Sequence, residues 1–182
     1  MTTKLLLSVA AIAVLMSVSN GAGVAQAAVS NAVEMKHYRN EHWKFELDIP
    51  ARWTVVPTGV GKNEVAHFIS VENGKHQVLV SRHMMRPKQT PKMVVDENQQ
   101  NLTQKGYTNF VSGETMIGSN RALTLDFETH APEAPDGKTW YCRHYYVIKG
   151  NIGYLLAFGT SDRDAMFDVY DRMAKSFVFE DL

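Results

Sequence analysis

TWYCRHYYVIKGNIGYLLAFG, residues 139–159, decides how this chain folds. Two runs rich in aromatic and aliphatic side chains, 139–149 and 152–159, flank the dipeptide Gly150-Asn151. Glycine and asparagine readily take the positive φ angles of a tight turn, so the stretch predicts an antiparallel β-hairpin.

The first run of this hairpin alternates its side chains between two faces. One face carries Trp140, Cys142, His144, Tyr146 and Ile148, and the other carries Tyr141, Arg143, Tyr145 and Val147. Both faces are largely apolar or aromatic, as expected of a central strand that is covered on both sides. We therefore expect helices on both faces of the sheet.

Further strand-like runs precede this hairpin. They are residues 43–49, 53–56, 65–72, 75–85, 107–117 and 121–130. Asn73-Gly74 predicts a second hairpin, and Gly118-Ser119-Asn120 predicts the turn of a third. The proline- and glycine-bearing segments 57–63 and 131–137 predict loops. The short connections favour antiparallel pairing throughout.

Two helices are predicted among these strands. Thr90 precedes Pro91, the usual order of a helix cap and first helical residue, and Gly106 follows at the expected end, which predicts a helix over residues 91–105. Ser161 is expected to cap a second helix, whose apolar side carries Met166, Val169, Tyr170, Met173 and Phe177. Residues 177–180 are expected to form a short extended tail. The predicted fold class is α+β, an antiparallel β-sheet with helices packed on its faces.

The N-terminal segment has the pattern of an export signal: Lys4 gives a positive start, an apolar run follows, and Ala25-Gln26-Ala27 ends it. We predict cleavage between Ala27 and Ala28, which gives a periplasmic or secreted protein. The apolar run is shorter than the roughly 20 residues that cross a bilayer, so no stable membrane insertion is expected after cleavage. The expected organisation is a signal peptide at 1–27, a flexible lead at 28–42 and a single domain at 43–182.

Composition and motifs narrow the classes of function that we expect for this chain. The 182 residues include Lys+Arg 19 and Asp+Glu 19, so there is no overall basic charge to attract nucleic acid. The sequence contains no Gly-x-Ser-x-Gly, no His-Glu-x-x-His and no nucleotide-binding glycine fingerprint. We therefore expect a protein that is not an enzyme, needs no cofactor and does not bind nucleic acid.

The candidate metal ligands are few. Cys142 is the single cysteine, so no intrachain disulfide can form, and its simplest role is that of a small packed side chain. Cys142 and His144 nevertheless lie on one strand face and could share a metal, which makes them weak candidate ligand positions. His83, beside Met84 and Met85, offers a softer combination that would suit copper.

Two parts of the chain resemble PsbP-like domains, the family that includes exported bacterial DcrB-like members. The opening match comprises residues 38–45, Leu47-Asp48-Ile49-Pro50 and Trp53. The closing match comprises Tyr145-Tyr146-Val147, a Lys-Gly turn, Tyr154-Leu155-Leu156, a capped helix and Ser176-Phe177. The resemblance implies an α/β/α sandwich and a non-enzymatic accessory role: family members support photosystem II, are exported bacterial proteins, or bind protein partners.

The leading hypothesis is therefore a soluble exported accessory domain with a protein partner, whose identity the sequence does not give. The alternative is a periplasmic carrier of a small molecule or metal ion, based on the aromatic strands and on Cys142 with His144.

Overall fold

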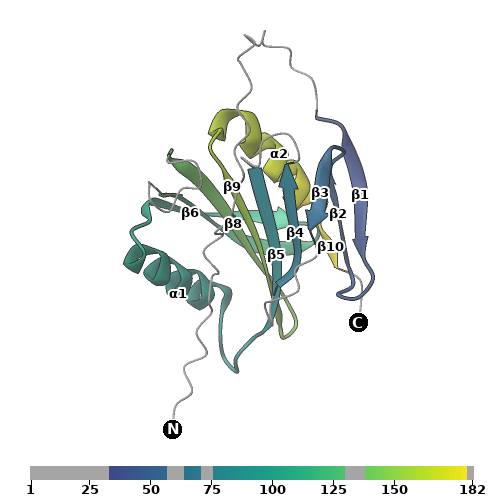
Figure 1. Cartoon of the computed structure of the whole chain (residues 1–182). Helices are drawn as coiled ribbons and strands as arrows, with labels where there is room; N and C mark the ends of the chain where they lie inside the picture. The colour runs from purple at the N-terminus through teal and green to yellow at the C-terminus, as the bar shows by residue number, and fades with distance from the viewer. Residues whose placement is uncertain (1–32, 57–63, 71–75, 130–137, 180–182) are drawn as a thin grey trace.

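The computed structural model describes residues 33–56, 64–70, 76–129 and 138–179, which form ten strands and two helices. Seven strands make one sheet in the order β3-β4-β5-β9-β8-β7-β6, with every neighbouring pair antiparallel (Figure 1). In that order they are Trp53–Val56, Glu64–Ser70, His76–Met84, Ile152–Thr160, Trp140–Lys149, Asn120–Thr129 and Thr108–Ile117.

The predicted hairpins are present. β8 and β9 pair antiparallel around Gly150, which has a φ of 60°, and β6 and β7 pair around Gly118, which has a φ of 57°. β4 pairs with β5 as predicted, although the turn at Asn73-Gly74 lies outside the described residues. The predicted loops at 57–63 and 131–137, the signal segment and its cleavage position between Ala27 and Ala28 also lie outside them.

A second sheet includes N-terminal residues that were predicted to be flexible. Residues Met35–Asn40, which were expected in a flexible lead, form strand β1 and pair with β2, Phe45–Pro50. The tail strand β10, Val178–Phe179, pairs with the other side of β2, so the order is β1-β2-β10. The predicted extended tail is thus confirmed, and it joins a three-stranded sheet that was not predicted.

Helix α1 spans Pro91–Gln104 and begins as predicted. The Thr90 hydroxyl accepts a hydrogen bond from the backbone N–H of Met93 at 3.3 Å, and Pro91 opens the helix. Gly106, with a φ of 86°, takes the chain away from the helix end. The buried side of α1 carries Val94, Val95, Asn98 and Leu102.

Helix α2 spans Arg163–Lys175, and its cap differs from the expectation. Asp162, not Ser161, is the N-cap, and its side chain accepts from the backbone N–H of Ala165. The reason is that β9 continues to Thr160. The Thr160 hydroxyl then accepts a hydrogen bond from the backbone N–H of Asp162. The helix therefore starts one residue later, while its predicted apolar side is buried as expected.

The two helices belong to different core clusters. Tyr146, Leu155 and Ala157 pack in the cluster that contains the buried side of α1. The adjacent residues Tyr145 and Leu156 pack in the cluster that contains α2 and the buried side chains of β2. Because successive residues of a strand point to opposite faces, the two clusters lie on opposite faces of the large sheet. Figure 1 shows α1 and the small sheet on either side of the long strands. The α2 face is thus covered by a helix and a sheet together.

Candidate functional site

The predicted ligand pair lies beneath α1. Cys142 packs against the α1 cluster, and His144 is buried with its ring edge-on to Phe127, 4.7 Å between ring centroids. Burial raises the pKa of the Cys142 thiol to about 12 and lowers the pKa of His144 to about 3. Both groups are therefore neutral near pH 7.

The surroundings of this pair are a packed core. His144 Nδ1 lies 3.1 Å from the Tyr146 hydroxyl oxygen, and Asn98 of α1 also hydrogen-bonds that hydroxyl. Nowhere in the described ranges do three or more His, Cys, Asp or Glu side chains gather to hold a metal ion. The structure places Cys142 and His144 on one face, as expected, but no described His, Cys, Asp or Glu side chain joins them as a third ligand.

A second polar cluster joins the opposite face of the sheet to α2. Arg143 donates through Nε and Nη2 to the Asp126 carboxylate at 2.8 and 2.7 Å, and through Nη1 to Asp171 of α2 at 2.8 Å. Tyr145 donates to the same Asp171 carboxylate. The hydrogen bond to Asp126 raises the pKa of Arg143, and burial raises that of Tyr145. Each of these four side chains bonds to another member of the cluster, and Asp171 ties α2 to the sheet through Arg143 and Tyr145.

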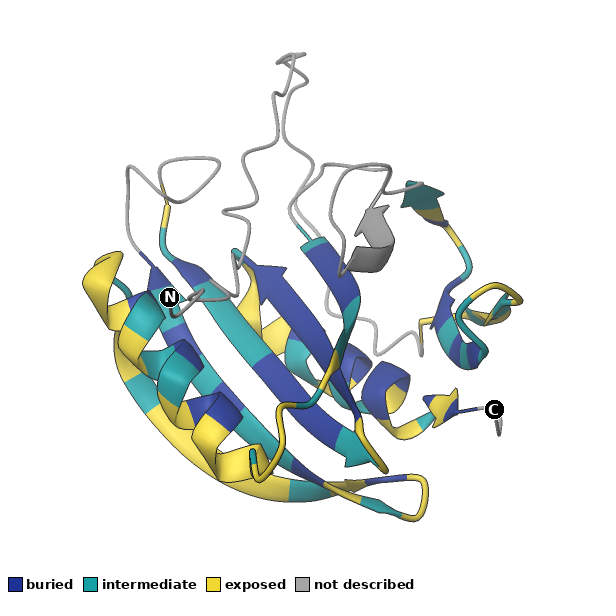
Figure 2. Cartoon of the chain, turned by 90° about the horizontal axis from the view of Figure 1, so that it is seen from below, coloured by how far each residue is buried: buried dark blue, intermediate teal, exposed yellow. Residues whose placement is uncertain are grey.

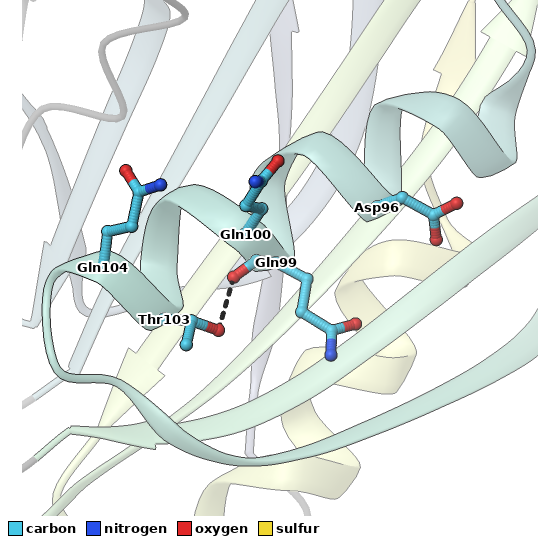
Figure 3. Close-up of a pocket in the computed structure, with 5 residues that line it drawn as sticks. All are labelled: Asp96, Gln99, Gln100, Thr103 and Gln104. Carbon is cyan, nitrogen blue, oxygen red and sulfur yellow. Dashed lines mark hydrogen bonds between the residues drawn. The ribbon is translucent and has the colours of Figure 1, made fainter.

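A shallow surface hollow lies along the outer side of α1 (Figure 3). Its lining is polar and comes from this helix alone: Asp96, Gln99, Gln100, Thr103 and Gln104. The Thr103 hydroxyl bonds the backbone oxygen of Gln99 at 2.9 Å, and Asp96 is held by Lys92 Nζ at 2.8 and 2.7 Å. Among the residues that the structure describes, no group from another element lines this hollow.

Strand β6 forms one edge of the large sheet, and we call its outer side the β6 edge, residues 108–117. Most of its side chains are exposed, including the apolar Val111 (64% exposed) and Met116 (52%). Figure 2 shows the sheet margin beside α1 largely in the colour of exposed residues. No described strand pairs with its outer N–H and C=O groups.

The β6 edge differs in charge from β1, an edge of the small sheet. β1 carries Lys36, His37 and Arg39, and charged side chains on an edge discourage pairing with another chain. β6 has a single charged residue, Glu114, which is already ion-paired with Arg121. A bulge between Thr108 and Val111 interrupts its start, but the register from Val111 to Ile117 is regular. This regular part is the best candidate for an interaction surface.

The sequence predicts this strand but not its place at an edge of the sheet. The polar residues on both of its faces were the available signal, since a strand buried between neighbours would be more apolar.

Within the described ranges, no helix is long and apolar enough to cross a membrane.

Comparisons with known proteins identify the fold. No protein-family model matches the chain, and no curated protein is similar to it in sequence. Among solved structures, cyanobacterial PsbP from Synechocystis is similar with a TM-score of 0.62 at 12% identity, covering 86% of this chain and 99% of its own.

Two further solved structures share the architecture. LpqN of Mycobacterium tuberculosis, involved in cell envelope biogenesis, has a TM-score of 0.59 at 12% identity and covers 83% of this chain and 93% of its own. The Ran-binding protein Mog1p of Saccharomyces cerevisiae has a TM-score of 0.59 at 9% identity, and the match covers 81% of this chain and 96% of Mog1p. At such identities the similarity concerns the fold. The resemblance noted in the sequence is confirmed at that level, and the chain has the PsbP-like fold.

Proposed function

We propose that this chain is an exported, non-enzymatic accessory domain that binds an extended segment of a partner protein along the β6 edge. The observation that carries the proposal is the regular, exposed and nearly uncharged edge from Val111 to Ile117. An added strand would bond to the main-chain groups on the outer side of β6, which is a common way for a sheet to bind a peptide.

Side chains on both faces of the β6 edge indicate the polarity and charge of the partner segment that would fit it. Val111 lies opposite Asp126, on the α2 face, and Met116 lies opposite Arg121, on the α1 face. Glu114 and Asn109 are already bonded to Arg121 and Glu128. A segment with apolar side chains and little charge therefore fits this edge best.

The structural neighbours support an interaction role without naming the partner. Mog1p is a Ran-binding protein, whereas LpqN is involved in cell envelope biogenesis. The missing catalytic motifs and the absence of a convergent polar site at α1 support the non-enzymatic part.

Site-specific photocrosslinking tests the proposal. A photoreactive residue is placed at Val111 or Met116, with Val178, 51% exposed on the small sheet, as the matched control. In cells, the β6 positions are expected to give one discrete adduct with another protein, and Val178 is not. Adducts of equal yield at all three positions, or none at the β6 positions, would contradict binding at this edge.

Export is a separate part of the proposal and rests on the pattern of residues 1–27. Cell fractionation followed by N-terminal sequencing checks it. The expected product lies outside the cytoplasm and begins at Ala28, and an uncut cytoplasmic chain would refute this part alone.

A further inference from the structure

His83 and Met85 converge above Gly153. His83 is directly opposite Gly153 in the pairing of β5 with β9, and Met85 follows the end of β5 on the same face of the sheet. A Cβ placed on Gly153 would stand 2.6 Å from His83 Nε2 and 2.9 Å from Met85 Sδ. The imidazole nitrogen and the thioether sulfur thus approach a single point, and only a glycine leaves room for both.

The nitrogen at this point has no hydrogen-bond partner among the described residues. His83 Nε2 is buried, and no group in the described part of the chain bonds to it. Buried polar atoms are nearly always bonded, so one without a partner calls for an explanation. Burial also lowers the pKa of His83, which favours the neutral imidazole, the form that binds metal ions.

The two donors together select a class of ligand. A thioether binds soft cations, and an imidazole binds several transition metals, so the pair suits Cu(I) better than zinc, calcium or magnesium. We propose that His83 and Met85 form a binding site for one Cu(I) ion, with Nε2 and Sδ as ligands. The ion would supply the partner that Nε2 lacks. This site is distinct from the β6 edge, and the inference does not depend on the proposed interaction.

Neighbouring sulfur atoms provide controls. Met84 is adjacent in sequence, but it is 63% exposed, and successive strand residues point to opposite faces. Cys142 is the one cysteine and the obvious competitor for Cu(I), but its pKa is raised to about 12 by burial. Met84→Leu and Cys142→Ala therefore separate the proposed site from other soft ligands.

The test is an anaerobic competition for Cu(I) between the full chain and bicinchoninate. The unmodified chain is expected to remove one equivalent of Cu(I) from the chelator. Met85→Leu, which nearly preserves volume, and His83→Leu are each expected to weaken binding at least tenfold, while Met84→Leu and Cys142→Ala leave it unchanged. Circular dichroism spectra verify that each variant is folded.

A second measurement locates the ion. With 13C-methyl-labelled methionine and Ag(I) as a diamagnetic probe, the Met85 methyl signal is expected to shift in the unmodified chain but not in His83→Leu. The proposal is overturned if no Cu(I) is retained, if Cys142→Ala abolishes binding, or if Met84→Leu and Met85→Leu have equal effects.

Discussion

At the scale of single residues, His144 shows how the core under α1 sets the chemistry of a side chain. It was a candidate metal ligand because of its spacing from Cys142, yet it is 5% exposed and faces Phe127 and Tyr146. A buried imidazole without a carboxylate partner is held neutral, since burial penalises the charged form. The burial of His144 is therefore expected to affect how the free energy of unfolding depends on pH.

We expect the free energy of unfolding to fall as pH drops from 6.5 toward 3. Across this range the unfolded chain protonates His144, whereas the folded chain, in which burial lowers its pKa to about 3, does not. The contribution is at most about 1.4 kcal/mol per pH unit. Urea unfolding at a series of pH values measures the slope, and His144→Gln is expected to reduce it. An unchanged slope in that variant would show that His144 titrates normally in the folded protein.

At the scale of elements, the anchoring of α2 depends on Arg143. Its guanidinium bridges Asp126 of β7 and Asp171 of α2 and lies over the Phe167 ring, 4.3 Å from the centroid. The side chain is 20% exposed, so its ion pairs are shielded from water more than those of the surface.

Arg143→Met is expected to destabilise the protein by about 2 kcal/mol, because Asp126 loses both of its bonds to the guanidinium and Asp171 keeps only the hydrogen bond from Tyr145. Arg121→Met is the matched control. Arg121 is ion-paired with Glu114 on the surface at 72% side-chain exposure, and its loss is expected to change stability by less than about 1 kcal/mol. Equal losses in the two variants, measured by urea unfolding, would contradict an anchoring role.

Local signals account for the elements that the sequence predicted. The hairpin at Gly150 and the start of α1 at Thr90-Pro91 depend on residues within one turn, and both are confirmed. β1 was missed because its charged side chains hide the pattern of a strand, and it is stabilised by pairing with β2. The position of β6 at an edge and the meeting of His83 with Met85 over Gly153 depend on strand order, which no local pattern contains.

At the scale of the whole molecule, the small sheet is tied to the large one by the end of the chain. Phe179 of β10 pairs with Phe45 of β2. Its ring also lies 4.7 Å from Tyr154 of β9 and 4.8 Å from Phe177, between centroids. One side chain thus contacts elements of both sheets.

Phe179→Ala is expected to cost about 3 kcal/mol, since it removes a buried aromatic ring and leaves a cavity. The adjacent Val178→Ala, at a residue that is 51% exposed, is expected to cost less than about 0.5 kcal/mol. Hydrogen exchange measures where the loss falls: the amides of β1 and β2 should lose protection before those of β5 and β9. Uniform loss across both sheets would show that the two unfold as one unit.

The position of β9 has a consequence for the order of folding. β9 is the last strand of the large sheet along the chain, yet it lies in the middle, between β5 and β8. β3-β4-β5 and β6-β7-β8 can each form from local contacts, but they join only when residues 152–160 are available. A growing chain therefore cannot close the large sheet before residues 152–160 have been synthesised. Under the proposed export, this late closure would leave the sheet incomplete, and the strands before β9 easier to pass across a membrane unfolded, until β9 follows them.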